Sequence, residues 1–321
     1  MQNLRGINSK LISLFKQSPL YQLVQENRDT ILACIRNNAI GLYYNSDKVA
    51  MVSLNHNGKL KCTINTYYLS DHYLHSKDKR NEGKEIYKTP KEIFDSFEII
   101  KKNSDCRSTP EKKAQQDIVA TNNSNRNSDW LCIDIEYRQS IKIQTAIPEK
   151  DQFTGRFDII AISKKKPYRI AIVELKYNDK AIGGDSGIVK HLKDFNKFDN
   201  NVCVNNLKEE IQMMLSNLND LGILNQDISV SNTVTDFAKK VEFYVICLYD
   251  TDESPRGKIG GYLFKEKHPE WGIKRVSRKN AEVELPEGCD ILNKVEFLFK
   301  RVKSPTKIDI TDILNIQNYE K

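Results

Sequence analysis

The segment GRFDIIAISKKKPYRIAIVELKY, residues 155–177, contains two apolar runs separated by a lysine-rich turn. Short β-branched runs bounded by turn formers are typical of buried strands, so the segment predicts an antiparallel hairpin. Asp158 and Glu174 are equally distant in sequence from Lys166, so a symmetric hairpin places the two carboxylates opposite each other. Lys176 follows Glu174 by two residues and therefore shares its strand face.

Three ionisable side chains on a largely apolar strand face need a compensating interaction. Opposed like charges destabilise a strand pair, and removing them from water adds a further cost. A divalent cation between Asp158 and Glu174 would offset this cost, and oxygen ligands favour Mg²⁺ or Mn²⁺ over zinc. Lys176 could then stabilise a phosphate transition state or help to deprotonate a water. The alternative is structural, with Asp158 beginning a strand beside Arg156 and the other two residues as charges at a strand end.

The regions on both sides of the hairpin alternate between helical and strand patterns. Residues 110–120 predict a helix, and the period-two pattern from Trp130 predicts a long strand with Ile135 and Tyr137 on one face and Glu136 on the other. Helical patterns near residues 188–195 and 205–222 precede a buried-type strand at 241–250. This order predicts an α/β fold in which helices flank a mixed central sheet.

The first part of the chain predicts a separate unit. A helical pattern is followed by four short strands with turn formers between them, including Asn57-Gly58, whose sequence favours a type I′ turn. The polar residues 76–88 indicate a linker or an exposed loop. We therefore expect an N-terminal domain of helix and antiparallel β-meander over residues 1–105 and a second domain over residues 106–321.

Composition restricts the function classes. The 321 residues carry a formal net charge of +7, which permits a polyanionic partner without requiring one. Seven cysteines without a CxxC pair argue against a disulfide framework and a structural zinc site. No apolar run approaches the ~20 residues of a membrane span, so we expect a cytoplasmic protein that makes no membrane contact.

The hairpin and its surroundings resemble the PD-(D/E)xK nuclease superfamily, which has the restriction-endonuclease-like fold. Asp158 matches the first aspartate of that motif, and Glu174-Leu175-Lys176 matches its (D/E)xK part; Phe157 stands where the family name has proline. Residues 109–250 follow the family order of helix, three strands, helix and strand. The resemblance implies metal-dependent hydrolysis of phosphodiester bonds, with DNA favoured over RNA. Asp158 and Glu174 would hold Mg²⁺ or Mn²⁺, and Lys176 would assist catalysis.

Further residues are candidates for the same site. Family members often add an acid from the first helix, a role that Glu111 could take, although a capping box with Ser108 is the alternative. Glu136 could approach the site from the preceding strand, or could simply be solvated. The candidate substrate-binding residues are Arg156, Lys180, Lys190 and His191. For His191, packing beside an apolar helix stripe is the alternative.

Other functions stay open at this level. The chain could be a nucleic-acid-binding protein that kept the fold and lost catalysis, or a protein-interaction or scaffold domain. The N-terminal domain could recognise the substrate or a partner. A homodimer would suit double-strand cleavage, although nothing in the sequence requires one.

Overall fold

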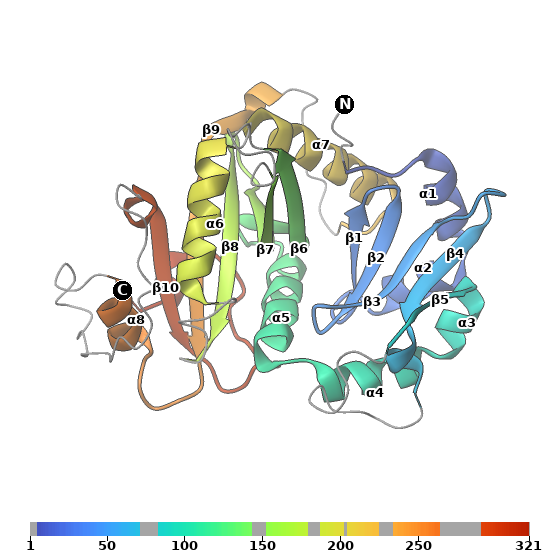
Figure 1. Ribbon diagram of the computed structural model, residues 1–321, viewed down its shortest axis with the longest axis horizontal. Helices are drawn as coiled ribbons and strands as arrows, with labels where there is room; N and C mark the ends of the chain where they lie inside the picture. Colours follow the sequence, from blue (N-terminus) through green and yellow to red (C-terminus); the bar gives the residue numbers. More distant parts are fainter. Residues whose placement is uncertain are drawn as a thin grey trace.

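The computed structural model describes residues 5–70, 83–142, 152–178, 187–201, 204–224, 234–263 and 290–320. Two five-stranded sheets form the molecule, one antiparallel and one mixed, and helices pack around them (Figure 1). The predicted α/β class, with a mixed sheet and an N-terminal meander, is confirmed. No helix in these ranges is both long and apolar enough to cross a membrane.

The N-terminal sheet is a meander in which each strand pairs with the next. Its strands are β1 (Leu32–Arg36), β2 (Ala39–Tyr44), β3 (Asp47–Leu54), β4 (Leu60–Asn65) and β5 (Glu85–Lys88). The fifth strand lies in the segment that we predicted to be a linker or loop, and it pairs with β4. The single expected N-terminal helix is instead two helices, α1 (Ser9–Lys16) and α2 (Pro19–Glu26), because Pro19 starts a new helix at its first position.

The turns of this sheet differ from the prediction in type. Asn57 does not adopt positive φ, so the Asn57-Gly58 turn is not type I′, although Gly58 has a φ of 69°. Consecutive positive φ values, 53° and 54°, occur instead at Asn45 and Ser46 between β2 and β3. A two-residue turn of this kind matches the twist of the flanking strands. Ser46 is thereby fixed at the end of the hairpin.

The second sheet, here called the core sheet, has the strand order β10-β9-β8-β7-β6. Its strands are β6 (Trp130–Lys142), β7 (Gln152–Ser163), β8 (Tyr168–Tyr177), β9 (Phe237–Tyr249) and β10 (Val295–Arg301). Strands β6, β7 and β8 pair antiparallel, whereas β8, β9 and β10 pair parallel. Ile159 pairs with Val173, so Asp158 and Glu174 occupy the next register position. The predicted hairpin is confirmed.

Helices cover both faces of the core sheet. On one face α5 (Pro110–Ser124) packs on Ile159 and Val173, and on the other α6 (Ile188–Asn201) and α7 (Val204–Asp220) pack on Ile160 and Ile172. Figure 1 shows α7 reaching from the core sheet toward β1. The remaining helices are α3 (Pro90–Asp95), α4 (Phe97–Arg107) and α8 (Arg256–Leu263), with short 3₁₀ turns at Thr66–Leu69, Val234–Asp236, Asp290–Asn293 and Ile316–Asn318.

Strand β6 is irregular where it meets the N-terminal sheet. Its register shifts between Cys132 and Asp134, and Glu136 has a φ of 54°. As a result Ile135 and Tyr137 belong to opposite apolar clusters, so the predicted strict alternation is wrong at this point. A bulge inserts an extra residue and turns the following side chains. This irregularity determines where the side chains of Asp134 and Glu136 point.

Asp134 ties the two sheets together. Its side chain is buried, and its oxygens accept hydrogen bonds from Arg5 at 2.7 Å and from Arg36 at 2.6 Å. Arg36 also donates to the Ile135 carbonyl at 2.7 Å and to the Tyr43 hydroxyl at 2.9 Å. The predicted boundary at residue 105 lies inside α4, and the larger apolar cluster includes residues of both sheets.

We expect Arg36→Lys to lower the free energy of unfolding by about 2 kcal/mol, because lysine keeps the charge but loses the planar fork that joins three acceptors. The matched control is Arg169→Lys. Arg169 also forms a two-bond pair, with Glu242, but it is half-exposed, so the cost should stay below about 0.5 kcal/mol. Denaturant unfolding measures both, and equal losses would contradict the assigned role of Arg36.

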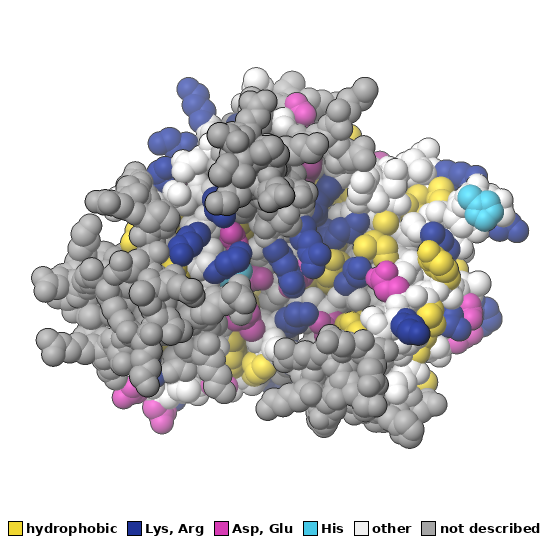
Figure 2. Space-filling view, in the orientation of Figure 1, with side chains coloured by type: hydrophobic (Ala, Val, Ile, Leu, Met, Phe, Trp, Pro, Cys, Tyr) yellow, Lys and Arg dark blue, Asp and Glu magenta, His cyan; other side chains and the backbone are white. Residues whose placement is uncertain are grey.

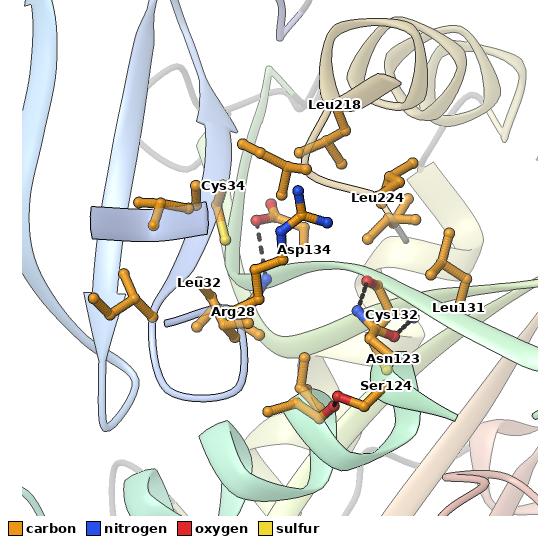
Figure 3. Close-up of a pocket in the computed structure, with 18 residues that line it drawn as sticks. Arg28, Leu32, Cys34, Asn123, Ser124, Leu131, Cys132, Asp134, Leu218 and Leu224 are labelled. Atoms are coloured by element: carbon orange, nitrogen blue, oxygen red, sulfur yellow. Dashed lines mark hydrogen bonds between the residues drawn. The ribbon is translucent and has the colours of Figure 1, made fainter. Parts of the chain in front are cut away.

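A small pocket lies beside this junction (Figure 3). It encloses about 70 Å³ among residues of β1, β6, α5 and α7, with Cys34, Cys132 and Leu218 in its wall. This volume suits a few water molecules. The pocket is therefore too small for a nucleotide.

Candidate active site

The open end of the β7–β8 hairpin brings the motif residues together. The Leu175 amide donates to Asp158 Oδ2 at 2.8 Å, which fixes the Asp158 carboxylate against the neighbouring strand. From α5, the Gln115 side chain donates to the Asp158 carbonyl at 2.6 Å. Strand and helix thus hold Asp158 from two sides.

Glu174 and Lys176 are almost completely buried, with exposed fractions of 1% and 2%. The Lys176 ammonium group contacts Glu174 Oε1 and lies 3.8 Å from Glu111 Oε1. Burial alone would lower the pKa of Lys176, but the carboxylates of Glu174, Asp158 and Glu111 raise it above its usual range. Lys176 is therefore a cation at neutral pH.

The two motif carboxyl groups have pKa values near 7. Burial, followed by the charge of Glu174, raises the pKa of Asp158 to about 7. Burial also raises the pKa of Glu174 to about 7, against the lowering effect of Lys176. Shifts of this kind, caused by burial and charged neighbours together, cluster at functional sites.

One carboxylate oxygen in this cluster lacks a partner. Glu174 Oε2 is buried and accepts no hydrogen bond from any described residue. An unsatisfied buried oxygen with a high negative charge density is costly unless a cation or a proton meets it. The donor set is hard oxygen, which suits Mg²⁺ or Mn²⁺.

The protein ligands for such a cation are few. Within the described ranges, no three His, Cys, Asp or Glu side chains converge closely enough to hold a metal ion by themselves. Mg²⁺ commonly binds through one or two carboxylates and completes its shell with water and substrate phosphate. The pair of Asp158 and Glu174 fits that mode of binding.

His191 joins the cluster from α6. Its Nε2 lies 2.9 Å from Glu174 Oε1, and its side chain is 15% exposed. Burial, reinforced by Lys176, lowers the pKa of His191 to about 4. The imidazole is neutral at pH 7, so Nε2–H donates to Glu174, and Nδ1 has no hydrogen-bond partner among the described residues. His191 therefore packs against the sheet and contacts the motif, while its expected contact with substrate stays a prediction.

Glu111 points toward the cluster from the first turn of α5. Burial raises the pKa of Glu111, against the lowering effect of Lys176. The capping box with Ser108 is wrong, because the helix begins at Pro110 and its N-cap is Thr109, which accepts from the Lys112 amide. Glu111 therefore does not cap α5.

Glu136 and Arg156 form an ion pair beside the cluster. Glu136 is buried, and its charge contributes to the raised pKa values of Asp158 and Glu174. The left-handed backbone at Glu136 brings this side chain off the expected strand face. Arg156 remains half-exposed at the edge of the site.

Of the two other predicted basic residues, the structure describes only Lys190. The Lys190 side chain pairs with Asp194 one turn along α6. Lys180 lies outside the described residues.

Comparisons with protein-family models, with curated proteins and with solved structures found no match.

Proposed function

We propose that the protein is a metal-dependent nuclease of the PD-(D/E)xK type with a restriction-endonuclease-like core, acting on DNA in preference to RNA. One observation carries the proposal: Asp158 meets the buried pair of Glu174 and Lys176 at the open end of a core hairpin, and one Glu174 oxygen has no hydrogen-bond partner among the described residues. A structural ion pair does not require that unsatisfied oxygen.

Each residue of the cluster has a separate role in the proposed hydrolysis of phosphodiester bonds. Asp158 and Glu174 would hold Mg²⁺ or Mn²⁺, which supplies Lewis-acid activation of water and phosphate. Lys176 supplies a fixed positive charge where negative charge develops on the phosphate oxygens. Glu111, 3.8 Å from Lys176, can orient a water on the side of the site facing α5. His191 positions Glu174 through its hydrogen bond.

The direct test incubates the purified protein with plasmid, single-stranded DNA and RNA in the presence of Mg²⁺, Mn²⁺ or EDTA. We expect products with either metal and none with EDTA, and DNA should be cut faster than RNA. If no substrate is cut under any condition while the protein is folded, the catalytic role of the hairpin carboxylates is wrong. Salt-sensitive binding without cutting would then favour a nucleic-acid-binding protein.

His191→Ala should reduce the cleavage rate by about 10- to 100-fold, as is usual when a residue that orients a metal-binding carboxylate is lost. The reason is that Glu174 Oε1 then depends on Lys176 alone. Gel assays at several Mg²⁺ concentrations measure this effect, and part of the loss should be recovered at high Mg²⁺. Exposed His56→Ala is the control and should leave the rate unchanged. An unchanged rate for His191→Ala would mean that His191 does not position Glu174 for catalysis.

A further inference from the structure

A cleft opens next to the candidate active site, between the N-terminal sheet and the core sheet. It encloses about 440 Å³. Glu136 and Arg156 form its wall on the core side and also adjoin the cluster of Asp158 and Glu174. Residues of β2, β3 and β4 and of the 3₁₀ turn after β4 form the opposite wall. The cleft therefore lies beside the site.

Positive charge predominates in this cleft. Its lining includes six basic residues, Arg5, Arg36, Lys48, Lys112, Arg138 and Arg156, against three acidic residues, Asp47, Glu85 and Glu136. Figure 2 shows Lys and Arg side chains gathered across the middle of the face where the two sheets meet. A concave surface of one predominant sign attracts a polyanion and raises its local concentration.

The basic residues of the cleft differ in the strength of their ion pairs. Arg5 and Arg36 are bound to buried Asp134, and Lys112 is bound to Asp47. Lys48 is half-exposed and only 3.8 Å from an exposed Glu85 carboxylate, which is a weak pair. Arg138 is exposed and has no carboxylate partner among the described residues. Lys48 and Arg138 can therefore bind a ligand without breaking a strong interaction.

A buried hydroxyl group also faces this cleft without a partner. Ser46 is 1% exposed and lines the cleft, and its Oγ forms no hydrogen bond with any described residue. Its neighbours in the lining include Lys48 and Lys112. Hydroxyl and ammonium groups in one cleft wall are suitable donors for a phosphate oxygen.

The size and the lining favour a single strand over a double helix. A volume of 440 Å³ is within the range of sites for small ligands, so the cleft suits a short segment of one strand. Tyr67 lies half-buried in the wall, with the Arg107 guanidinium over its ring at 4.0 Å from the centroid. Basic grooves with aromatic residues are typical of single-strand binding.

We infer that this cleft holds one polynucleotide strand, with a phosphate at Ser46 and Lys48 and the following backbone passing Arg138 and Arg156 toward the Asp158 and Glu174 site. The inference rests on the proposed nuclease function and specifies its substrate: a single strand, or the unpaired part of a duplex. The N-terminal sheet is then the substrate-binding part of the enzyme.

The test is binding measured in EDTA, because binding without metal is independent of cleavage. Fluorescence anisotropy with labelled single-stranded DNA, single-stranded RNA and blunt duplex DNA compares the wild type with the Lys48→Ala/Arg138→Ala variant. We expect the variant to bind single strands about tenfold more weakly, with a salt dependence lower by about 0.7 per lost phosphate contact. The matched control is Lys239→Ala/Lys240→Ala, which removes two exposed charges from β9 and should bind as the wild type does.

Ser46→Ala provides a second variant with no change in charge. Removing a hydroxyl that makes no hydrogen bond should leave the unfolding midpoint unchanged while weakening binding of single strands. Tighter binding of DNA or of RNA decides which strand the cleft takes. Blunt duplex bound as tightly as the single strand, or wild-type affinity in both cleft variants, would overturn the inference. If the cleft variants bind as the wild type does but still cut DNA in the presence of metal, the nuclease proposal stands and the cleft inference is wrong. If the variants lose binding while the wild type cuts no substrate, the cleft inference stands and the nuclease proposal is wrong.

Discussion

Asp158→Asn is expected to lower metal-dependent cleavage by at least about 10³-fold while the protein remains folded. Asparagine keeps the size of the side chain, and its carbonyl oxygen can still accept the Leu175 amide that Asp158 Oδ2 accepts at 2.8 Å. What is lost is the negative charge that would hold the cation. Glu174→Gln should have a comparable effect for the same reason.

The control for these variants is Glu242→Gln. Glu242 is a strand carboxylate on β9 that pairs with half-exposed Arg169, three residues along β9 from Val245, the register partner of Glu174. Its loss should leave the rate within about twofold of wild type, since an exposed pair contributes little to stability. Initial rates on the preferred substrate, with circular dichroism to verify folding, give the comparison. Retention of more than a tenth of the wild-type rate by folded Asp158→Asn would exclude this residue from catalysis.

The sequence predicted those features that depend on local period. Apolar alternation and the equal distances from Lys166 gave the pairing of Asp158 with Glu174, because a hairpin register follows from its turn. The four strands of the meander follow in the same way from turn residues and β-branched runs.

Features that depend on tertiary contacts were not predictable in this way. The bulge in β6 and the positive φ of Glu136 reverse the strand pattern, and no local residue preference indicates a left-handed glutamate. The clamp of Arg5 and Arg36 on Asp134 joins residues 129 and 98 positions apart. Lys48, with its weak ion pair to Glu85, and Arg138, which has no carboxylate partner among the described residues, line one cleft only because the two sheets face each other. The net charge of the chain had permitted a polyanionic partner.

We expect the metal-free protein to become less stable as the pH rises from about 4 to above 7, and Mg²⁺ to restore stability mainly at high pH. The folded state keeps protons on Asp158 and Glu174 up to about pH 7, whereas the unfolded chain loses them near its ordinary values. The folded state therefore binds more protons between these limits, so its stability falls with rising pH. For Glu174 the shift corresponds to at most about 3 kcal/mol.

His191 acts in the opposite direction and must be separated from this effect. Its folded pKa of about 4 lies below the unfolded value, so its contribution to stability increases with pH up to about 6.5. A comparison of wild type with Asp158→Asn/Glu174→Gln at pH 5 and at pH 8 isolates the carboxyl groups, because both proteins keep His191. In EDTA the double variant should be the more stable protein at pH 8, and the difference should be small at pH 5.

Thermal unfolding with and without Mg²⁺ completes the measurement. Binding of a cation to the ionised carboxylates stabilises the folded state by mass action, so Mg²⁺ should raise the wild-type Tm more at pH 8 than at pH 5. The double variant should show no such increase at either pH, since it lacks the charges that hold the cation. A wild-type protein that is insensitive to Mg²⁺ at pH 8, and more stable there than the double variant in EDTA, would mean that Lys176 already balances the two carboxylates and that the cluster is a structural ion pair. If Mg²⁺ stabilises the wild type at pH 8, and the double variant is the more stable protein in EDTA, the two carboxylates destabilise the metal-free fold. A bound cation would then be the partner that compensates for their charge.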